Sequence, residues 1–184
     1  IRAQFNLGAR YRNGWEVIQD YKEAVKWYRL AVNQGDAPSQ YELGLMYEYG
    51  QGVERDYSEA VKLYKLSVDQ GNAKAQYSLG SMYADGKGVP LNNKEAIKLY
   101  RLAGDQGDAE LAYNVGLMYA NGDRVDQDYK EAINFFDKAA KQGNAAAQFS
   151  IGLCYQYGRG VTQNYEEAIK WYRKSAEQGD ADGQ

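Results

Sequence analysis

The sequence predicts an all-α fold, an α/α solenoid of five tandem helix-turn-helix repeats. The first observation behind this prediction is a period of 36 residues in glycine, tyrosine, glutamate and alanine. The second is a pair of helical apolar patterns inside each period, each with its own start and stop signals. One such unit cannot bury its apolar face alone, so repeats of this length stack on their neighbours.

The period is clearest in the 20 glycines. One column lies in the middle of the first helix of each repeat, where glycine costs about 1 kcal/mol relative to alanine. We therefore expect a neighbouring helix backbone to approach closely there. The three columns present in all repeats are Gly8, Gly44, Gly80, Gly116, Gly152; Gly14, Gly50, Gly86, Gly122, Gly158; and Gly35, Gly71, Gly107, Gly143, Gly179.

The first helix of a repeat is illustrated by the second period. Gln40, Leu43, Gly44 and Tyr47 recur at the spacing of one helical face, which predicts a helix from about Ala37 to Glu48. The glycines of the segment 50–52 then end the pattern.

The second helix follows after a short loop, from about Tyr57 to Gln70. Gly71 stands where a helix end favours a left-handed residue. Its start is marked by a column of Asp and Asn residues with Glu three positions later, which is typical of an N-cap. The column consists of Asp20, Asp56, Asn92, Asp128 and Asn164.

Four positions depart from the repeat pattern. Glu16 and Arg124 replace the second glycine of the loop between the two helices, so we expect the first and fourth of these loops to differ in conformation. Ala112 replaces a glutamine of the first helix, and Asn93 replaces the tyrosine that opens the second helix elsewhere.

Two apolar columns predict the core. Trp27, Leu63, Leu99, Phe135 and Trp171 form one, and Tyr28, Tyr64, Tyr100, Phe136 and Tyr172 form the other. Burying such rings contributes roughly 1.5–3 kcal/mol each. Cys154 occupies the column of Met46, Met82 and Met118, which predicts an apolar, partly buried thiol.

The third period resembles a Sel1-like repeat in the runs Ala-Lys-Ala-Gln-Tyr-Ser-Leu-Gly-Ser-Met-Tyr (73–83), Gly-Lys-Gly-Val (86–89) and Glu-Ala-Ile-Lys-Leu-Tyr (95–100). The resemblance implies a right-handed superhelix related to tetratricopeptide arrays, and a role as adaptor or scaffold in protein complexes. It places one array over residues 1–184, with repeats at 1–36, 37–72, 73–108, 109–144 and 145–180. Residues 181–184 begin a sixth repeat, so we expect a piece of a longer protein.

Composition argues against most catalytic chemistry. The chain has no histidine and one cysteine, so it cannot form an internal disulfide or a His or Cys zinc site. The net charge of −3 and the absence of a long apolar run argue against nucleic acid and against direct membrane insertion. We expect no cofactor and no metal. The Gly-x-Gly segments are interpreted as turns, and the acids near Asp126 as a solvated loop. Localisation stays open between the bacterial periplasm or secretion and the cytoplasm.

Three function classes remain. The first is a non-catalytic scaffold that binds a partner protein or peptide in a concave groove, which the repeat architecture favours. The second is a structural array that self-associates, for example as a homodimer. The third is an enzyme that binds or hydrolyses β-lactams, as associated with cysteine-rich relatives of this repeat family. This chain lacks their paired cysteines and has no Ser-x-x-Lys, so we expect no enzyme.

The candidate binding surface consists of two columns on the first helices that lie off the packing stripe and vary among the repeats. Tyr49 and Tyr157 are candidate anchors, because aromatic residues dominate interface hot spots. The alternative is that these positions are only solvated and that the partner uses the convex face or a missing repeat. The first column is Asn6, Glu42, Ser78, Asn114 and Ser150, and the second is Asn13, Tyr49, Asp85, Asn121 and Tyr157.

Overall fold

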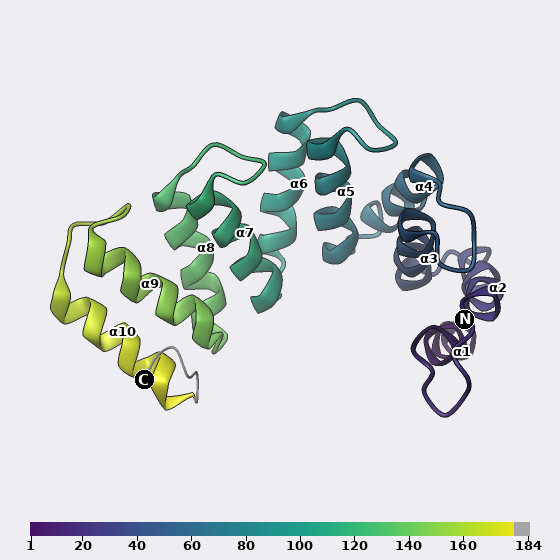
Figure 1. Ribbon diagram of the computed structural model, residues 1–184, viewed down its shortest axis with the longest axis horizontal. Helices are drawn as coiled ribbons and strands as arrows, with labels where there is room; N and C mark the ends of the chain where they lie inside the picture. The colour runs from purple at the N-terminus through teal and green to yellow at the C-terminus, as the bar shows by residue number, and fades with distance from the viewer. Residues whose placement is uncertain (179–184) are drawn as a thin grey trace. The chain divides into compact units, whose positions relative to one another are not determined.

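A computed structural model describes residues 1–178, which form ten α-helices and no strand (Figure 1). The predicted all-α solenoid of five helix-turn-helix repeats is confirmed. The expected start of a sixth repeat at 181–184 lies outside the described residues. The helices are α1 (Arg2–Asn13), α2 (Tyr21–Val32), α3 (Ala37–Tyr49), α4 (Tyr57–Val68), α5 (Ala73–Asp85), α6 (Asn93–Asp105), α7 (Ala109–Asn121), α8 (Tyr129–Lys141), α9 (Ala145–Tyr157) and α10 (Tyr165–Glu177).

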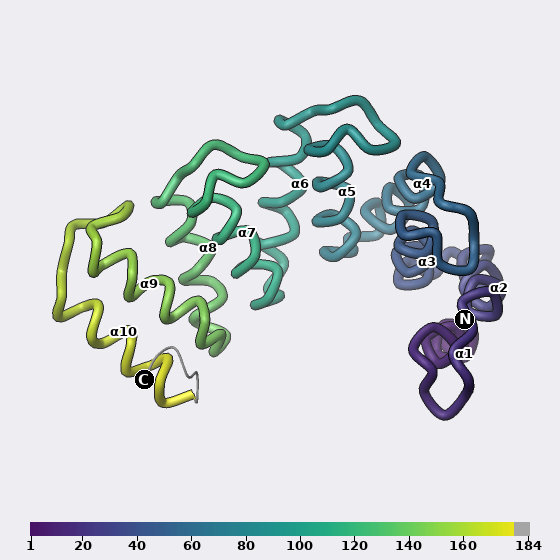
Figure 2. Tube along the Cα trace, in the orientation of Figure 1, coloured from purple at the N-terminus to yellow at the C-terminus, as the bar shows by residue number. Residues whose placement is uncertain are grey.

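Each repeat contributes a first helix, here called helix A, and a second, called helix B. The chain divides into two compact units, Ile1–Leu99 and Tyr100–Gln184, and the boundary falls inside α6. In unit 1, α1 packs on α2 and α3 on α4, while α2 contacts α3 and α4 contacts α5 across repeats. In unit 2, α7 packs on α8, α8 on α9 and α9 on α10. Figure 2 shows the longer loops that lead from helix A to helix B.

The predicted caps start the B helices. Asp56 accepts hydrogen bonds from the backbone N–H groups of Ser58 and Glu59 at 2.9 and 3.0 Å. Asn164 accepts in the same way from Glu167 at 3.1 Å. These bonds satisfy N–H groups that have no partner within the helix. The α3 and α4 bounds agree with the prediction within two residues, and Gly71 has the predicted left-handed φ of 82°.

The glycine in the middle of helix A faces an aromatic ring of helix B, not a backbone. A Cβ on Gly44 would lie 2.6 Å from Cε1 of Tyr64, and one on Gly152 would lie 2.4 Å from Cε1 of Tyr172. The expected close contact is therefore confirmed, but the expected approach of a helix backbone is wrong for these sites. The ring fills the volume that a methyl group would need.

The expectation that the first and fourth A-to-B loops differ is also wrong. Glu16 and Arg124 have φ values of 60° and 64°, close to the 72° of Gly52 in the second repeat. The loop keeps its left-handed residue even where a side chain disfavours it. The packed ends of helices A and B determine the path of the loop more strongly than the local preference of one residue.

The predicted core columns are buried in part, because Trp27, Trp171 and Tyr172 are only half-buried. In unit 1, Tyr28 and Tyr64 are buried with Met46 and Met82 in two neighbouring clusters. In unit 2, Phe135 and Phe136 of α8 are buried, and so is Cys154, as predicted from its column.

Candidate functional site

The two predicted columns lie on the A helices and none of their residues is buried. The second column, at the last position of helix A, is exposed in every repeat. The first column is half-buried except at Asn6, which is exposed. Unit 1 carries Asn6, Asn13, Glu42, Tyr49, Ser78 and Asp85, and unit 2 carries Asn114, Asn121, Ser150 and Tyr157.

Glu42 is held by an arginine of the preceding repeat. Its Oε2 lies 2.5 Å from Nη1 of Arg12, and both side chains are largely covered. Burial raises the pKa of Glu42, and the charge of Arg12 opposes that shift. This carboxylate is therefore already paired within the chain, which makes it a weak attractor for a cation of a partner.

The two predicted anchor tyrosines present most of their surface to solvent. Tyr49 is 64% exposed and Tyr157 is 57% exposed. Beside Tyr49, Glu48 accepts a hydrogen bond from the buried Tyr64 hydroxyl at 2.6 Å. Partial burial and the charge of Glu48 raise the pKa of Tyr49. Glu48 is thus committed to the core, while the Tyr49 ring remains available for contact.

A third column, which the sequence analysis missed, adjoins the second column. It is the residue directly after the glycine that ends helix A, and it differs in every repeat. That variation was visible in the sequence and could have revealed the column. Lys87 pairs with Asp85 at 2.9 Å, whereas Trp15 is 61% exposed. The column consists of Trp15, Gln51, Lys87, Asp123 and Arg159.

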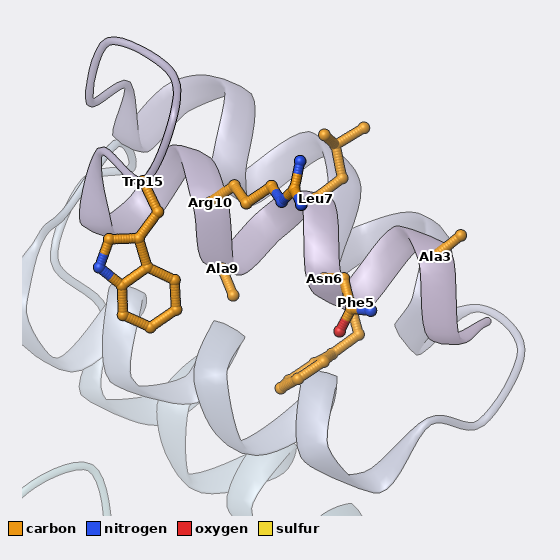
Figure 3. A pocket seen from close by; sticks show the side chains of 7 residues that line it. All are labelled: Ala3, Phe5, Asn6, Leu7, Ala9, Arg10 and Trp15. Carbon is orange, nitrogen blue, oxygen red and sulfur yellow. The ribbon is translucent and has the colours of Figure 1, made fainter.

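Trp15 and Asn6 help to line a surface hollow of about 600 Å³ on α1. Figure 3 shows Phe5, Ala9 and Trp15 extending toward the same side of the helix. Two aromatic side chains therefore flank a small residue, which leaves room for an apolar side chain between them. Asn6 is the predicted site residue that this hollow includes.

The remaining predicted residues differ in burial. Ser78 lies close enough to Tyr41 to lower the pKa of that phenol, although burial raises it more strongly. Asn13 and Asn121 are exposed at the ends of α1 and α7, and Asn114 and Ser150 are half-buried. Tyr157 thus contacts Arg159, and Asp85 pairs with Lys87. The predicted residues are distributed along the repeats and do not line one common pocket.

Within residues 1–178, no group of three acidic or cysteine side chains is placed to hold a metal ion. No helix in that range is both long enough and apolar enough to cross a membrane. Burial raises the pKa of the Cys154 thiol to about 11. A thiol in this state is a poor nucleophile at neutral pH.

A family model for the Sel1 repeat matches residues 1–36, 37–72, 73–108, 109–144 and 145–180. The chain belongs to the Sel1 repeat family. Proteins of this family are generally non-catalytic scaffolds for protein interactions. No curated protein matches this Sel1 repeat chain.

Solved structures of Sel1 repeat proteins are similar to this chain. A protective antigen of uropathogenic Escherichia coli strains is 36% identical over 99% of this chain, with a TM-score of 0.83. The chain spans only 39% of the length of that antigen. A Sel1 repeat protein from Oxalobacter formigenes is 35% identical over 97% of this chain and 74% of its own, with a TM-score of 0.79. The immunity protein Pa5087 from Pseudomonas aeruginosa, 24% identical over 95% of this chain and 66% of its own at a TM-score of 0.56, shares the fold.

Proposed function

We propose that this Sel1 repeat chain is a non-catalytic scaffold that binds a partner protein or peptide on the helix-A faces of its units. The observation that carries the proposal is the placement of exposed aromatic side chains. Trp15, Tyr49 and Tyr157 follow or end three A helices and are each more than half exposed. Large exposed rings at recurrent positions are typical anchors of protein interfaces.

The chemistry around these rings supports binding over catalysis. Glu42 is paired with Arg12, and Glu48 accepts the hydroxyl of Tyr64. Asp56 and Asp128 cap the B helices through their carboxylates. Each of these acids has a structural partner. The polar residues around the rings can therefore position a peptide by hydrogen bonds while the rings provide contact area.

The test uses a phage-displayed library of random peptides selected against the immobilised chain. Affinities of the selected peptides are then measured for Tyr49→Ala and Tyr157→Ala, with Tyr165→Ala as the control. Tyr165 is 62% exposed, but it opens helix B of the fifth repeat and belongs to neither proposed column. We expect binding to weaken at least tenfold in one or both column variants, a change of about 1.4 kcal/mol, with no change in melting temperature. Equal loss in the control, or wild-type affinity in both column variants, would move the site elsewhere.

A further inference from the structure

We infer that Tyr129, Tyr157 and Arg159 of unit 2 form a docking site for a carboxylate of the bound peptide. The inference rests on the proposed function, because it names the chemistry of the partner at one part of the helix-A surface. Tyr157 belongs to the predicted columns, whereas Arg159 and Tyr129 do not. The three residues come from the end of α9, the loop that follows it and the start of α8.

The guanidinium of Arg159 lies close to two tyrosine rings. Its central carbon is 5.1 Å from the ring centre of Tyr157 and 5.5 Å from that of Tyr129. Such cation–π contacts stabilise a guanidinium and fix its plane. Among residues 1–178, Arg159 forms no ion pair with a carboxylate. Its charge and its N–H donors are thus positioned without an acidic partner in that part of the chain.

The loop that carries Arg159 is fixed on both sides. The backbone N–H of Arg159 donates to the carbonyl of Cys154 at 2.9 Å. The next residue, Gly160, packs so closely on the start of α8 that a Cβ there would lie 2.6 Å from the carbonyl carbon of Tyr129. Gln163 further ties the loop to α9 by donating to the carbonyl of Gln156 at 2.8 Å. A cation held in place before binding loses less conformational freedom when a ligand arrives.

The third repeat shows what this position looks like when the charge is neutralised internally. There, Lys87 takes the place of Arg159, and Asp85 takes the place of Tyr157. The two form an ion pair of 2.9 Å. In the fifth repeat the acid is replaced by a tyrosine, so the cation keeps its place in the loop but pairs with no acid among the described residues. The missing acid is the group that we expect the partner to supply.

The acidic residue nearest in sequence to Tyr129 does not compete for this role. Asp128 caps α8, and its Oδ1 accepts from the backbone N–H groups of Lys130 and Glu131 at 2.9 and 3.1 Å. An Asp or Glu side chain, or a C-terminal carboxylate, suits the two-pronged edge of a guanidinium. The flanking rings favour an apolar or aromatic residue next to that carboxylate.

The experiment selects random dodecapeptides on phage against the wild-type chain and against three variants. Arg159→Gln removes the charge. Tyr157→Asp recreates the acid of the third repeat, so Arg159 pairs internally. Arg173→Gln is the control, because Arg173 is an exposed arginine on α10. We expect wild type and the control to enrich peptides with an acid beside an apolar residue, and the two test variants to lose that enrichment.

Affinity measurements on one enriched peptide then provide the quantitative test. We expect Arg159→Gln to weaken binding about tenfold and Arg159→Lys to restore part of the loss, because lysine keeps the charge but not the planar fork. Replacing the peptide's acid by its amide should weaken binding to wild type but not to Arg159→Gln. Melting temperatures of all variants show whether folding is intact.

The outcomes separate the two proposals. The carboxylate site is overturned if the selected peptides show no preference for an acid, or if they bind Arg159→Gln with wild-type affinity. Neither result contradicts the scaffold function. A chain that enriches no peptide on any of its surfaces overturns the scaffold function and, with it, the carboxylate site.

Discussion

At the scale of single residues, the contact between Gly44 and Tyr64 shows why helix A carries glycine where alanine would form a better helix. The Tyr64 ring is buried between α3 and α4, and its hydroxyl donates to Glu48 at one end of that contact. A ring fixed at both its face and its hydroxyl has little room to move aside. The glycine therefore sets how closely the two helices of the repeat approach.

Gly44→Ala should destabilise the chain by about 1 kcal/mol. Alanine improves helix propensity by about 1 kcal/mol, but the added methyl would overlap the Tyr64 ring, and such overpacking costs about 1–3 kcal/mol. Urea denaturation measures the difference. Lys62→Ala on the exposed face of α4 is the control, since its ion pair with Glu59 is largely exposed and contributes little. A variant as stable as wild type would show that the ring yields.

Cys154 gives a second prediction at this scale, through its pKa. The folded thiol has a pKa of about 11 against an ordinary 9.0, so its thiolate fraction at pH 8 is about a hundredfold below that of an exposed thiol. We expect slow labelling by a thiol reagent in the native chain and fast labelling in urea. Asn121→Cys, exposed at the end of α7, is the fast control in a Cys154→Ser background. Equal native rates would contradict the burial.

The same shift predicts how stability depends on alkaline pH. Because the folded thiol holds its proton above the pH at which the unfolded thiol releases it, the free energy of unfolding falls as pH rises from about 9 to about 11. Burial also raises the pKa of Tyr28 and Tyr64, which adds a loss of the same sign above pH 10.

At the scale of elements, each helix B starts at a polar cap that the sequence already reveals. Asp56→Ala should lower the free energy of unfolding by about 1 kcal/mol, because two N–H groups at the start of α4 lose their acceptor. Asp56→Asn should stay within a few tenths of a kcal/mol of wild type, since Asn92 and Asn164 perform this role in other repeats. The two variants are compared by urea denaturation, and equal losses would show that charge matters more than the hydrogen bonds.

Elements are also where the limits of sequence reasoning become clear. The caps and the glycines that end the helices could be predicted because they depend on residues within one helix or loop. The pairing of Glu42 with Arg12 could not, because the two are 30 residues apart and meet only when repeats stack. The left-handed φ of Glu16 was also missed, since packing at the loop ends overrides the preference of the residue itself. The variable column that contains Arg159 was visible in the sequence, but the contact of Arg159 with Tyr129 was not, because those residues are 30 positions apart and belong to different repeats.

At the scale of the whole molecule, the same contacts between neighbouring repeats recur at the period of the sequence. Arg29 of α2 donates to the hydroxyl of Tyr47 in α3 at 2.7 Å, and Arg101 donates likewise to Tyr119 at 3.0 Å. Gly52 packs against the backbone of Tyr21, as Gly160 does against Tyr129. Because these interfaces are alike, the stability of the array is approximately a sum over repeats and their neighbours.

Deletion of residues 37–72 tests that additivity. It joins Asp36 to Ala73, and Asp36 caps α3 as Asn72 caps α5, so helix A of the next repeat still follows an N-cap. We expect a folded chain of lower stability, with a urea m-value reduced by about a fifth, in proportion to the residues removed.

Deletion of residues 37–66 is the control. It removes α3 and most of α4 but keeps Ser67. In wild type, Ser67 is buried and donates to the carbonyl of Ala37 in α3 at 2.7 Å, so in this deletion it loses the helix on which it packs. The out-of-register chain should therefore lose more stability although it retains more residues, and equal stability of the two deletions would contradict a repeat-based fold.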